Sequence, residues 1–176
     1  MRHFVTAAIL ILLLGACSTR LTETGTELPA EGGWVLLPIV NQSQAPRAGE
    51  RVEALVETEL RVRGVHPIHY PVAPPRDPLA LVDEQQRFER ALRWARSQGY
   101  RYGITGSVQE WRYKSGLDGE PAVGISLRVI DVASGEVLWA ASGARTGWGY
   151  ESATGTAAKL VRKLLSELKL TAKVSS

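Results

Sequence analysis

The chain has 176 residues, with 21 Lys and Arg against 18 Asp and Glu, a net charge of +3 at neutral pH. So small a positive excess gives no support for nucleic acid or for an acidic polymer as a partner. A single cysteine, Cys17, excludes an intramolecular disulfide and a metal site built from several thiolates.

The first part of the chain, residues 1–16, predicts a lipoprotein signal peptide. A positive start and an uncharged, mainly apolar run at 4–14 precede small residues at 15–16 and then Cys17. The run is too short for a membrane-spanning helix, which needs about 20 residues. We expect cleavage before Cys17 and lipidation of its thiol, although a simple signal peptide with a chance cysteine is the alternative. Ser18, in place of Asp, favours the periplasmic face of the outer membrane as the final location.

The mature chain is predicted to have two parts. Residues 17–33 hold the lipidated Cys17 and a flexible tether, because 18–33 are polar and rich in Thr, Gly and Glu. Residues 34–172 are expected to form a single α/β domain.

The first half of this domain alternates strand and helix patterns. An apolar run at 34–40 has strand length, and Pro38 within it predicts a sheet edge or a bulge. A helix at 49–63 and a short strand at 65–69 follow, and the proline-rich residues 71–78 predict a stiff surface loop. The apolar face of the helix is formed by Val52, Leu55, Val56 and Leu60, with Arg51, Glu53, Glu57 and Arg61 elsewhere.

The second half predicts a helix at 83–98, strands at 101–113, 122–132 and 136–145, and a final helix at 152–169. The strands at 122–132 and 136–145 are predicted to form a tight hairpin. The element order is therefore β-α-β-α-β-β-β-α. The simplest packing of this order is an α/β fold in which helices pack on an open mixed sheet.

Motifs that carry catalysis or bind metals receive little support. His66 and His69 are three residues apart on a predicted strand and would point to opposite faces, with no acidic or thiol ligand nearby in the sequence. Gly155–Lys159 lacks the first glycine and the ending of a phosphate loop. Ser166 and Lys169 have Ser-x-x-Lys spacing but lie in the last turn of a helix. We therefore expect a protein that is not an enzyme and has no cofactor or metal.

Aromatic residues are frequent in the second half of the chain. Trp139, in the middle of a strand, is expected in the core. Trp148 and Tyr150 lie in a glycine-flanked loop between a strand and a helix, where large rings are often displayed. Their apolar bodies and polar tips suit a membrane interface or a protein contact.

Two carboxylates, Asp118 and Glu120, lie at the tip of a predicted hairpin. In a monomer they are best interpreted as a solvated turn with Asp-Gly geometry. In a symmetric oligomer the same turn repeats around an axis, and the resulting collar of negative charge would attract a polycation.

Several stretches together resemble the PelC family, the outer-membrane lipoproteins of Pel exopolysaccharide secretion. The most specific are Gly-Ser-Val-Gln-Glu-Trp-Arg-Tyr at 106–113 and Leu-Asp-Gly-Glu-Pro at 117–121. More distantly, the element order is similar to curli-secretion lipoproteins and to amino-terminal domains of the TolB type. The other matching stretches are 34–41, 45–50, 90–95, 103–105 and 144–152.

The resemblance implies a homo-oligomeric ring of about twelve subunits on outer-membrane lipid, with the chain as its own partner. It also implies an acidic funnel that guides cationic, partly deacetylated Pel polysaccharide to a PelB-type porin. On this picture Trp148, with Tyr150, faces the membrane. Asp118, with Glu120, belongs to the funnel, and Arg101 supports the subunit contact.

Two other functional classes remain as alternatives. A regulatory periplasmic lipoprotein that activates a cell-wall synthase would need a long disordered tether, and 18–33 are short for that purpose. An enzyme that modifies the polymer would need a catalytic constellation, which the sequence does not supply.

Overall fold

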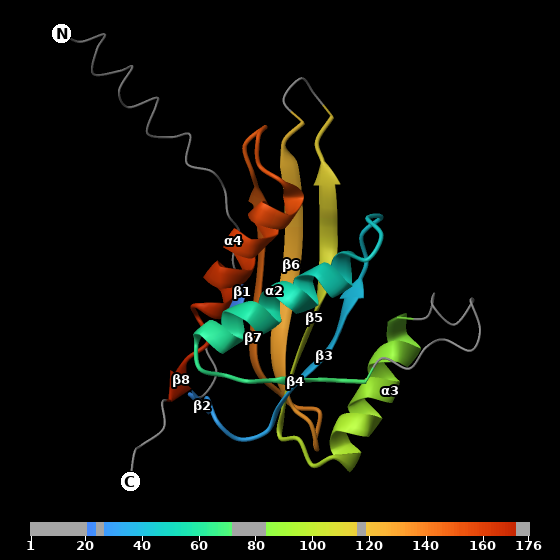
Figure 1. The fold of residues 1–176 in the computed structure, drawn as a ribbon, viewed down its shortest axis with the longest axis vertical. Coiled ribbons are helices and arrows are strands. Elements are labelled where there is room, and N and C mark those ends of the chain that lie inside the picture. The colour runs from blue at the N-terminus through green and yellow to red at the C-terminus, as the bar shows by residue number, and fades with distance from the viewer. Residues whose placement is uncertain (1–20, 24–26, 72–83, 116–118, 172–176) are drawn as a thin grey trace, which may run out of the picture.

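A mixed six-stranded sheet forms the centre of the molecule (Figure 1). The computed structural model describes residues 21–23, 27–71, 84–115 and 119–171. Within these ranges, no helix has the length and apolar character needed to cross a membrane. The strand order is β1-β7-β6-β5-β3-β4, and a separate two-stranded sheet pairs β2 with β8.

The described elements follow the predicted order, with extra short strands. The strands are β1 (Leu21–Glu23), β2 (Leu28–Pro29), β3 (Trp34–Asn41), β4 (Ile68–His69), β5 (Tyr102–Tyr113), β6 (Pro121–Asp131), β7 (Val137–Thr146) and β8 (Leu170–Thr171). The helices are α2 (Ala48–Val62), α3 (Glu84–Ser97) and α4 (Ala153–Leu165). Strand β3 runs parallel to β4 and β5, whereas β5, β6, β7 and β1 pair antiparallel. The predicted α/β fold with helices on a mixed sheet is confirmed.

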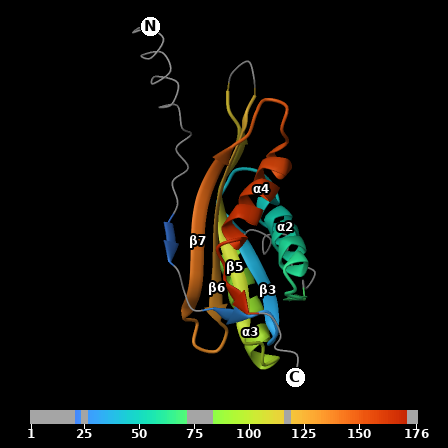
Figure 2. The same ribbon diagram turned by 90° about the vertical axis from the view of Figure 1, so that its left-hand side faces the viewer.

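Helices cover the two faces of the sheet unequally (Figure 2). Helices α2 and α4 pack side by side on one face, here called the inner face, and enclose the larger core. Helix α3 packs on the opposite, outer face, where Ala91 and Ala95 contact the apolar group around Val35 and Leu37. Among the described residues, the helical cover of the outer face therefore lies near the start of β3.

The inner core confirms two predicted patterns. Alternate residues of β6 from Val123 to Val129 are at most 1% exposed, as expected for a strand with one fully buried face. The apolar stripe of α4 is also buried, and Ser152 caps the helix by accepting a hydrogen bond from Gly155 N at 3.0 Å. Trp139, 2% exposed, lies in this core as predicted.

The segment expected to be a flexible tether differs from its prediction wherever it is described. Residues 21–23 pair with β7, and Leu28 is 4% exposed beside β8. Leu28 N donates a hydrogen bond to Lys169 O at 3.0 Å. The composition of 18–33 gave no sign of these pairings, because both partners come from the far end of the chain.

Pro38 produces a bulge, one of the two outcomes that the sequence predicted. The register between β3 and β5 shifts between Leu36 and Ile39. The Pro38 carbonyl accepts a hydrogen bond from Thr105 Oγ1 at 2.6 Å, and Ile39 N donates to Glu53 Oε1 at 3.0 Å. Side chains thus replace the backbone pairing that the bulge interrupts.

Glu53 corrects the helix prediction, which placed it away from the apolar face. It is 3% exposed and lies at the buried centre of a cluster with Tyr70, Arg87 and the exposed His69. Arg87 Nη2 lies 3.1 Å from Glu53 Oε1, and His69 Nε2 lies 3.4 Å from Glu53 Oε2. Arg87 Nε also donates to the Tyr70 hydroxyl at 2.6 Å. Periodicity alone cannot find such a carboxylate, because its partners come from β3, β4 and α3.

The cluster raises the pKa of both His69 and Tyr70. The hydrogen bond to Glu53 is the largest cause of a raised His69 pKa, since it favours the protonated imidazole. Burial, followed by the charge of Glu53, raises the pKa of Tyr70 to about 12.

The cluster predicts a pH-dependent contribution of His69 to stability. Because the folded-state pKa is raised, this contribution is fully present below the unfolded-state pKa of about 6.5 and is lost as pH rises through the folded-state value. The free energy of unfolding, measured with urea, should therefore fall more in His69→Gln at about pH 5.5 than at about pH 8.5. His66→Gln is the matched control, since His66 contacts Arg61 instead of Glu53. Equal losses for His69→Gln at both pH values would contradict the assigned ion pair.

Candidate functional site

The loop between β7 and α4 displays two large aromatic residues at one end of the sheet (Figure 1). Trp148 is 78% exposed and Tyr150 is fully exposed. The prediction that these rings are displayed is therefore confirmed. The remaining question is what holds so short a loop in place.

Gly147 fixes the start of the loop. Its N–H donates a hydrogen bond to Pro121 O at 2.8 Å, which joins the loop to the first residue of β6. A Cβ at this position would lie 2.4 Å from both Glu151 Oε2 and Thr156 Oγ1 and 2.8 Å from Pro121 Cγ. Only glycine fits this close approach. The residue that precedes the exposed Trp148 is therefore tightly packed against Glu151, Thr156 and Pro121.

Glu151 fixes the end of the loop. Its N–H donates to Trp148 O at 2.8 Å and closes the turn. Its carboxylate accepts a hydrogen bond from Thr156 Oγ1 at 3.3 Å and pairs with Lys159. A carboxylate beside the first turn of α4 is also favoured by the helix dipole. Lys159, on an exposed part of α4, therefore supports the loop and forms no phosphate site.

Tyr113 is a third exposed aromatic residue at this end, and the sequence analysis did not assign it to the site. Its side chain is 56% exposed, and its hydroxyl accepts a hydrogen bond from Ala153 N at 3.1 Å. Its position at the last residue of β5, next to the hairpin, was the available signal. We name Tyr113, Trp148 and Tyr150 together the aromatic end.

The acidic hairpin lies at the same end of the sheet. Lys114 N donates to Glu120 O at 2.8 Å, and Lys114 Nζ lies 3.4 Å from Glu120 Oε2. This pair partly neutralises the Glu120 carboxylate. Asp118 lies outside the described residues. Pro121 joins the hairpin to the loop of Trp148 through its hydrogen bond with Gly147.

Arg101 lies at the opposite end of β5 from Tyr113. It is exposed, its carbonyl accepts a hydrogen bond from Val132 N at 2.9 Å, and its guanidinium lies 5.2 Å from the centre of the Tyr102 ring. Tyr102 in turn packs against Trp34 with ring centres 5.1 Å apart. The fold therefore brings the aromatic residues and Glu120 to one end of the sheet but holds Arg101 about the length of a strand away.

The histidines form no metal site in the described part of the chain. His69 does have an acidic neighbour, Glu53, which the sequence did not reveal, but that carboxylate is already bound by Arg87 and Ile39 N. Across the described ranges, no three or more His, Cys, Asp and Glu side chains are grouped so that they could hold a metal ion.

Solved structures with the same fold include two PelC dodecamers from Paraburkholderia phytofirmans. A PelC variant is 34% identical, with a TM-score of 0.73 over 88% of this chain and 100% of that chain. A second PelC dodecamer is 35% identical, with a TM-score of 0.72 over 88% of this chain and 99% of that chain. The chain belongs to the PelC family.

Membership of the PelC family confirms the resemblance predicted from the sequence. Lipoprotein GNA1162 from Neisseria meningitidis is 16% identical, with a TM-score of 0.54 over 78% of this chain and 97% of that chain. That likeness extends to the fold alone. Neither the models of protein families nor the curated proteins gave a match.

The packed base of the loop predicts that Gly147 cannot be replaced. Gly147→Ala should lower the free energy of unfolding by about 1–3 kcal/mol, because the new methyl group overpacks the contact with Glu151, Thr156 and Pro121. Gly155→Ala is the matched control, since its Cβ would meet only Ser152 Oγ at 3.2 Å. In the first turn of α4 that change should be neutral or stabilise by up to about 1 kcal/mol. Urea unfolding measures both, and wild-type stability of Gly147→Ala would refute the packing argument.

Proposed function

We propose that this chain is a non-enzymatic, lipid-anchored subunit of the Pel exopolysaccharide export system at the periplasmic face of the outer membrane. The proposal depends on the exposed Trp148, which projects from a tightly packed loop. It also depends on the PelC relatives, whose solved structures are dodecamers. In this proposal the chain forms a ring of about twelve copies. Cys17, which lies outside the described residues, is exposed by removal of 1–16 and holds the lipid, and 17–33 lead into a domain at 34–172.

The aromatic end faces the lipid in this proposal. Trp and Tyr suit the boundary between acyl chains and water, because each has an apolar body and a polar tip. Partial burial of one Trp contributes about 2–3 kcal/mol, which is weak for a single copy. A ring presents every copy to the same surface, so many weak contacts add to one firm attachment.

The acidic hairpin is proposed as the part that guides a cationic polymer toward a PelB-type porin. The molecule as a whole is slightly basic, so attraction must come from a local field, repeated around the ring axis. Glu120 is paired with Lys114 and contributes less than its formal charge. Asp118, at the hairpin tip in the sequence, is therefore proposed to supply the larger share, and Arg101 to support the contact between subunits.

A cell-wall synthase regulator is the alternative, and the described tether argues against it. Such a regulator needs a long tether between its lipid anchor and its domain. Leu28–Pro29 pair with β8 and therefore shorten the segment that could extend from the membrane. A regulator would also act as a small species. The mass of the acylated protein in mild detergent, measured by mass photometry, separates a ring from that alternative.

Membrane contact can be tested by quenching of tryptophan fluorescence in vesicles that contain brominated lipids. The full-length acylated protein should be quenched, and Trp148→Phe should lose most of that quenching because the other described tryptophans are buried or partly buried. Trp139→Phe removes a core tryptophan and is the matched control, with quenching retained. Undiminished quenching in Trp148→Phe would mean that the loop does not reach the lipid.

Polymer guidance can be tested by secretion. Asp118→Asn combined with Glu120→Gln should reduce exported polysaccharide while protein level and ring mass stay at wild-type values, because the change removes charge without changing shape. Glu136→Gln, in the exposed turn between β6 and β7 at the other end of the sheet, is the control and should secrete normally. Normal secretion by the double variant would remove these two carboxylates from the proposal.

A further inference from the structure

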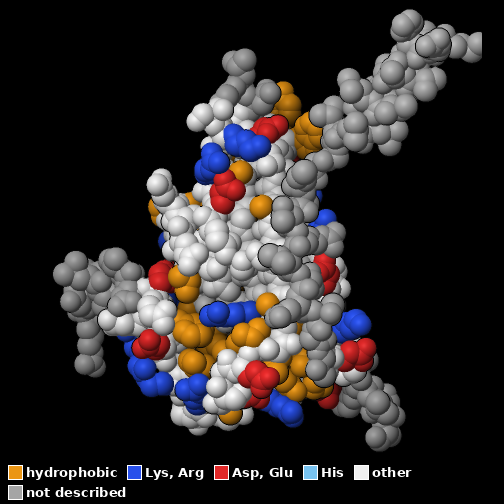
Figure 3. Space-filling model, turned by 180° about the vertical axis from the view of Figure 1, so that it is seen from behind, with side chains coloured by type: hydrophobic (Ala, Val, Ile, Leu, Met, Phe, Trp, Pro, Cys, Tyr) orange, Lys and Arg blue, Asp and Glu red, His pale blue; other side chains and the backbone are white. Residues whose placement is uncertain are grey.

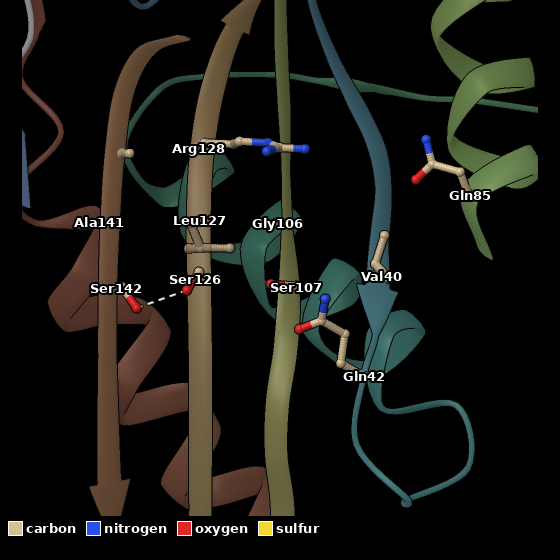
Figure 4. Close-up of a pocket in the computed structure, with 11 residues that line it drawn as sticks. Val40, Gln42, Gln85, Gly106, Ser107, Ser126, Leu127, Arg128, Ala141 and Ser142 are labelled. Carbon is tan, nitrogen blue, oxygen red and sulfur yellow. Dashed lines mark hydrogen bonds between the residues drawn. The ribbon is translucent and has the colours of Figure 1, made fainter. Parts of the chain in front are cut away.

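Part of the outer face of the sheet carries no helix among the described residues. Helix α3 covers this face beside β3, and beyond it lies a hollow of about 580 Å³ (Figure 4). Its floor is formed by neighbouring strands, and Gln85 on α3 borders it. Five polar residues lie across this floor or at its margin, and together we call them the outer patch: Gln42, Ser107, Gln109, Ser126 and Ser142.

Four side chains of the outer patch, those of Ser107, Gln109, Ser126 and Ser142, are hydrogen-bonded to one another. Gln109 Nε2 donates to Ser107 Oγ and to Ser126 Oγ, both at 2.8 Å. Ser126 Oγ and Ser142 Oγ are also 2.8 Å apart and share a hydrogen bond. Because these groups already have partners, a covering surface need not supply new ones, and the cost of removing water from them is low.

The five side chains of the outer patch are uncharged, and charged side chains border them. Arg128 lines the hollow itself, with its guanidinium 5.9 Å from the Phe88 ring, and the Glu110–Arg112 ion pair lies beyond Gln109. Seen from behind, this side of the molecule shows Lys or Arg side chains among hydrophobic and uncharged ones (Figure 3). A neutral centre with charge at the rim is the pattern of protein–protein contacts, and it offers no field to attract a cationic polymer.

The aromatic end determines which surfaces can meet in a ring. If that end rests on the membrane, the long strands stand away from the membrane plane, and the faces of the sheet become the sides of the subunit (Figure 2). A closed ring needs contacts between two different side surfaces of each copy. This step rests on the proposed function.

We infer that the outer patch is a contact surface for the neighbouring copy of this chain in the ring. Short side chains at Ser107, Ser126 and Ser142 allow the backbone of a neighbour to approach closely. The occupant is a second copy rather than the polymer, because the patch is neutral at its centre and lies on the side of the subunit.

Protection from labelling tests this inference without disturbing the fold. Gln109 and Ser97 are both exposed in the single chain, so cysteine at either position should react with a maleimide at similar rates in a monomer. In rings of the acylated protein, Gln109→Cys should react at least about tenfold more slowly than Ser97→Cys, because a neighbour excludes water from the patch. Equal rates in intact rings would overturn the inference while leaving the proposed ring in place.

A bulky substitution supplies the second test. Ser126→Arg should convert rings to small species by mass photometry, with the circular dichroism spectrum unchanged. Ser97→Arg, the same change at the end of α3, should leave rings intact. Intact rings in folded Ser126→Arg would overturn the inference, and a loss of export from such rings would assign the patch to the polymer instead. A wild-type protein without rings would overturn the proposed function itself, together with this inference.

Discussion

The buried carboxylate of Glu53 is the interaction on which the arrangement of the helices depends. It lies on α2, accepts a hydrogen bond from the backbone at the β3 bulge, and binds Arg87 of α3 and His69 of β4. A buried carboxylate is tolerated only when it is paired and hydrogen-bonded, so these partners must stay in place in the folded protein. One side chain therefore joins a helix of the inner face to the helix of the outer face and to strands β3 and β4.

The position of α3 decides how much of the sheet is left uncovered. Because Arg87 draws α3 toward β3 and β4, the helix packs near the start of β3 and leaves the outer patch beyond it. The inner face, in contrast, is closed by α2 and α4 over a large apolar core. In the described part of the chain, one face of the sheet is thus closed by two helices, and the other is covered by one helix over part of its area.

The two ends of the sheet are equally distinct. At one end, Gly147 and Glu151 form a rigid base from which Trp148 and Tyr150 project, and the acidic hairpin adjoins that base. At the other end, Arg101 lies over Tyr102. For a subunit of the proposed ring, one end would meet lipid and polymer, while the sides would meet neighbouring copies. In this proposal, a small domain can contact lipid, polymer and neighbouring copies at the same time, because each contact uses a different part of its surface.

Local sequence patterns were enough to predict the family, the α/β class, the order of the main elements and the display of Trp148. The signals are the periodicity in β6 and α4, the glycines around an aromatic residue, and specific stretches such as 106–113. The folded chain was needed to find that Glu53 is buried, that the tether pairs with β7 and β8, and that Tyr113 joins the aromatic end. In each case the partner that fixes the residue is distant in the chain, so it leaves no trace in the local pattern. Arg87 is 34 residues from Glu53, and Ala153 is 40 residues from Tyr113.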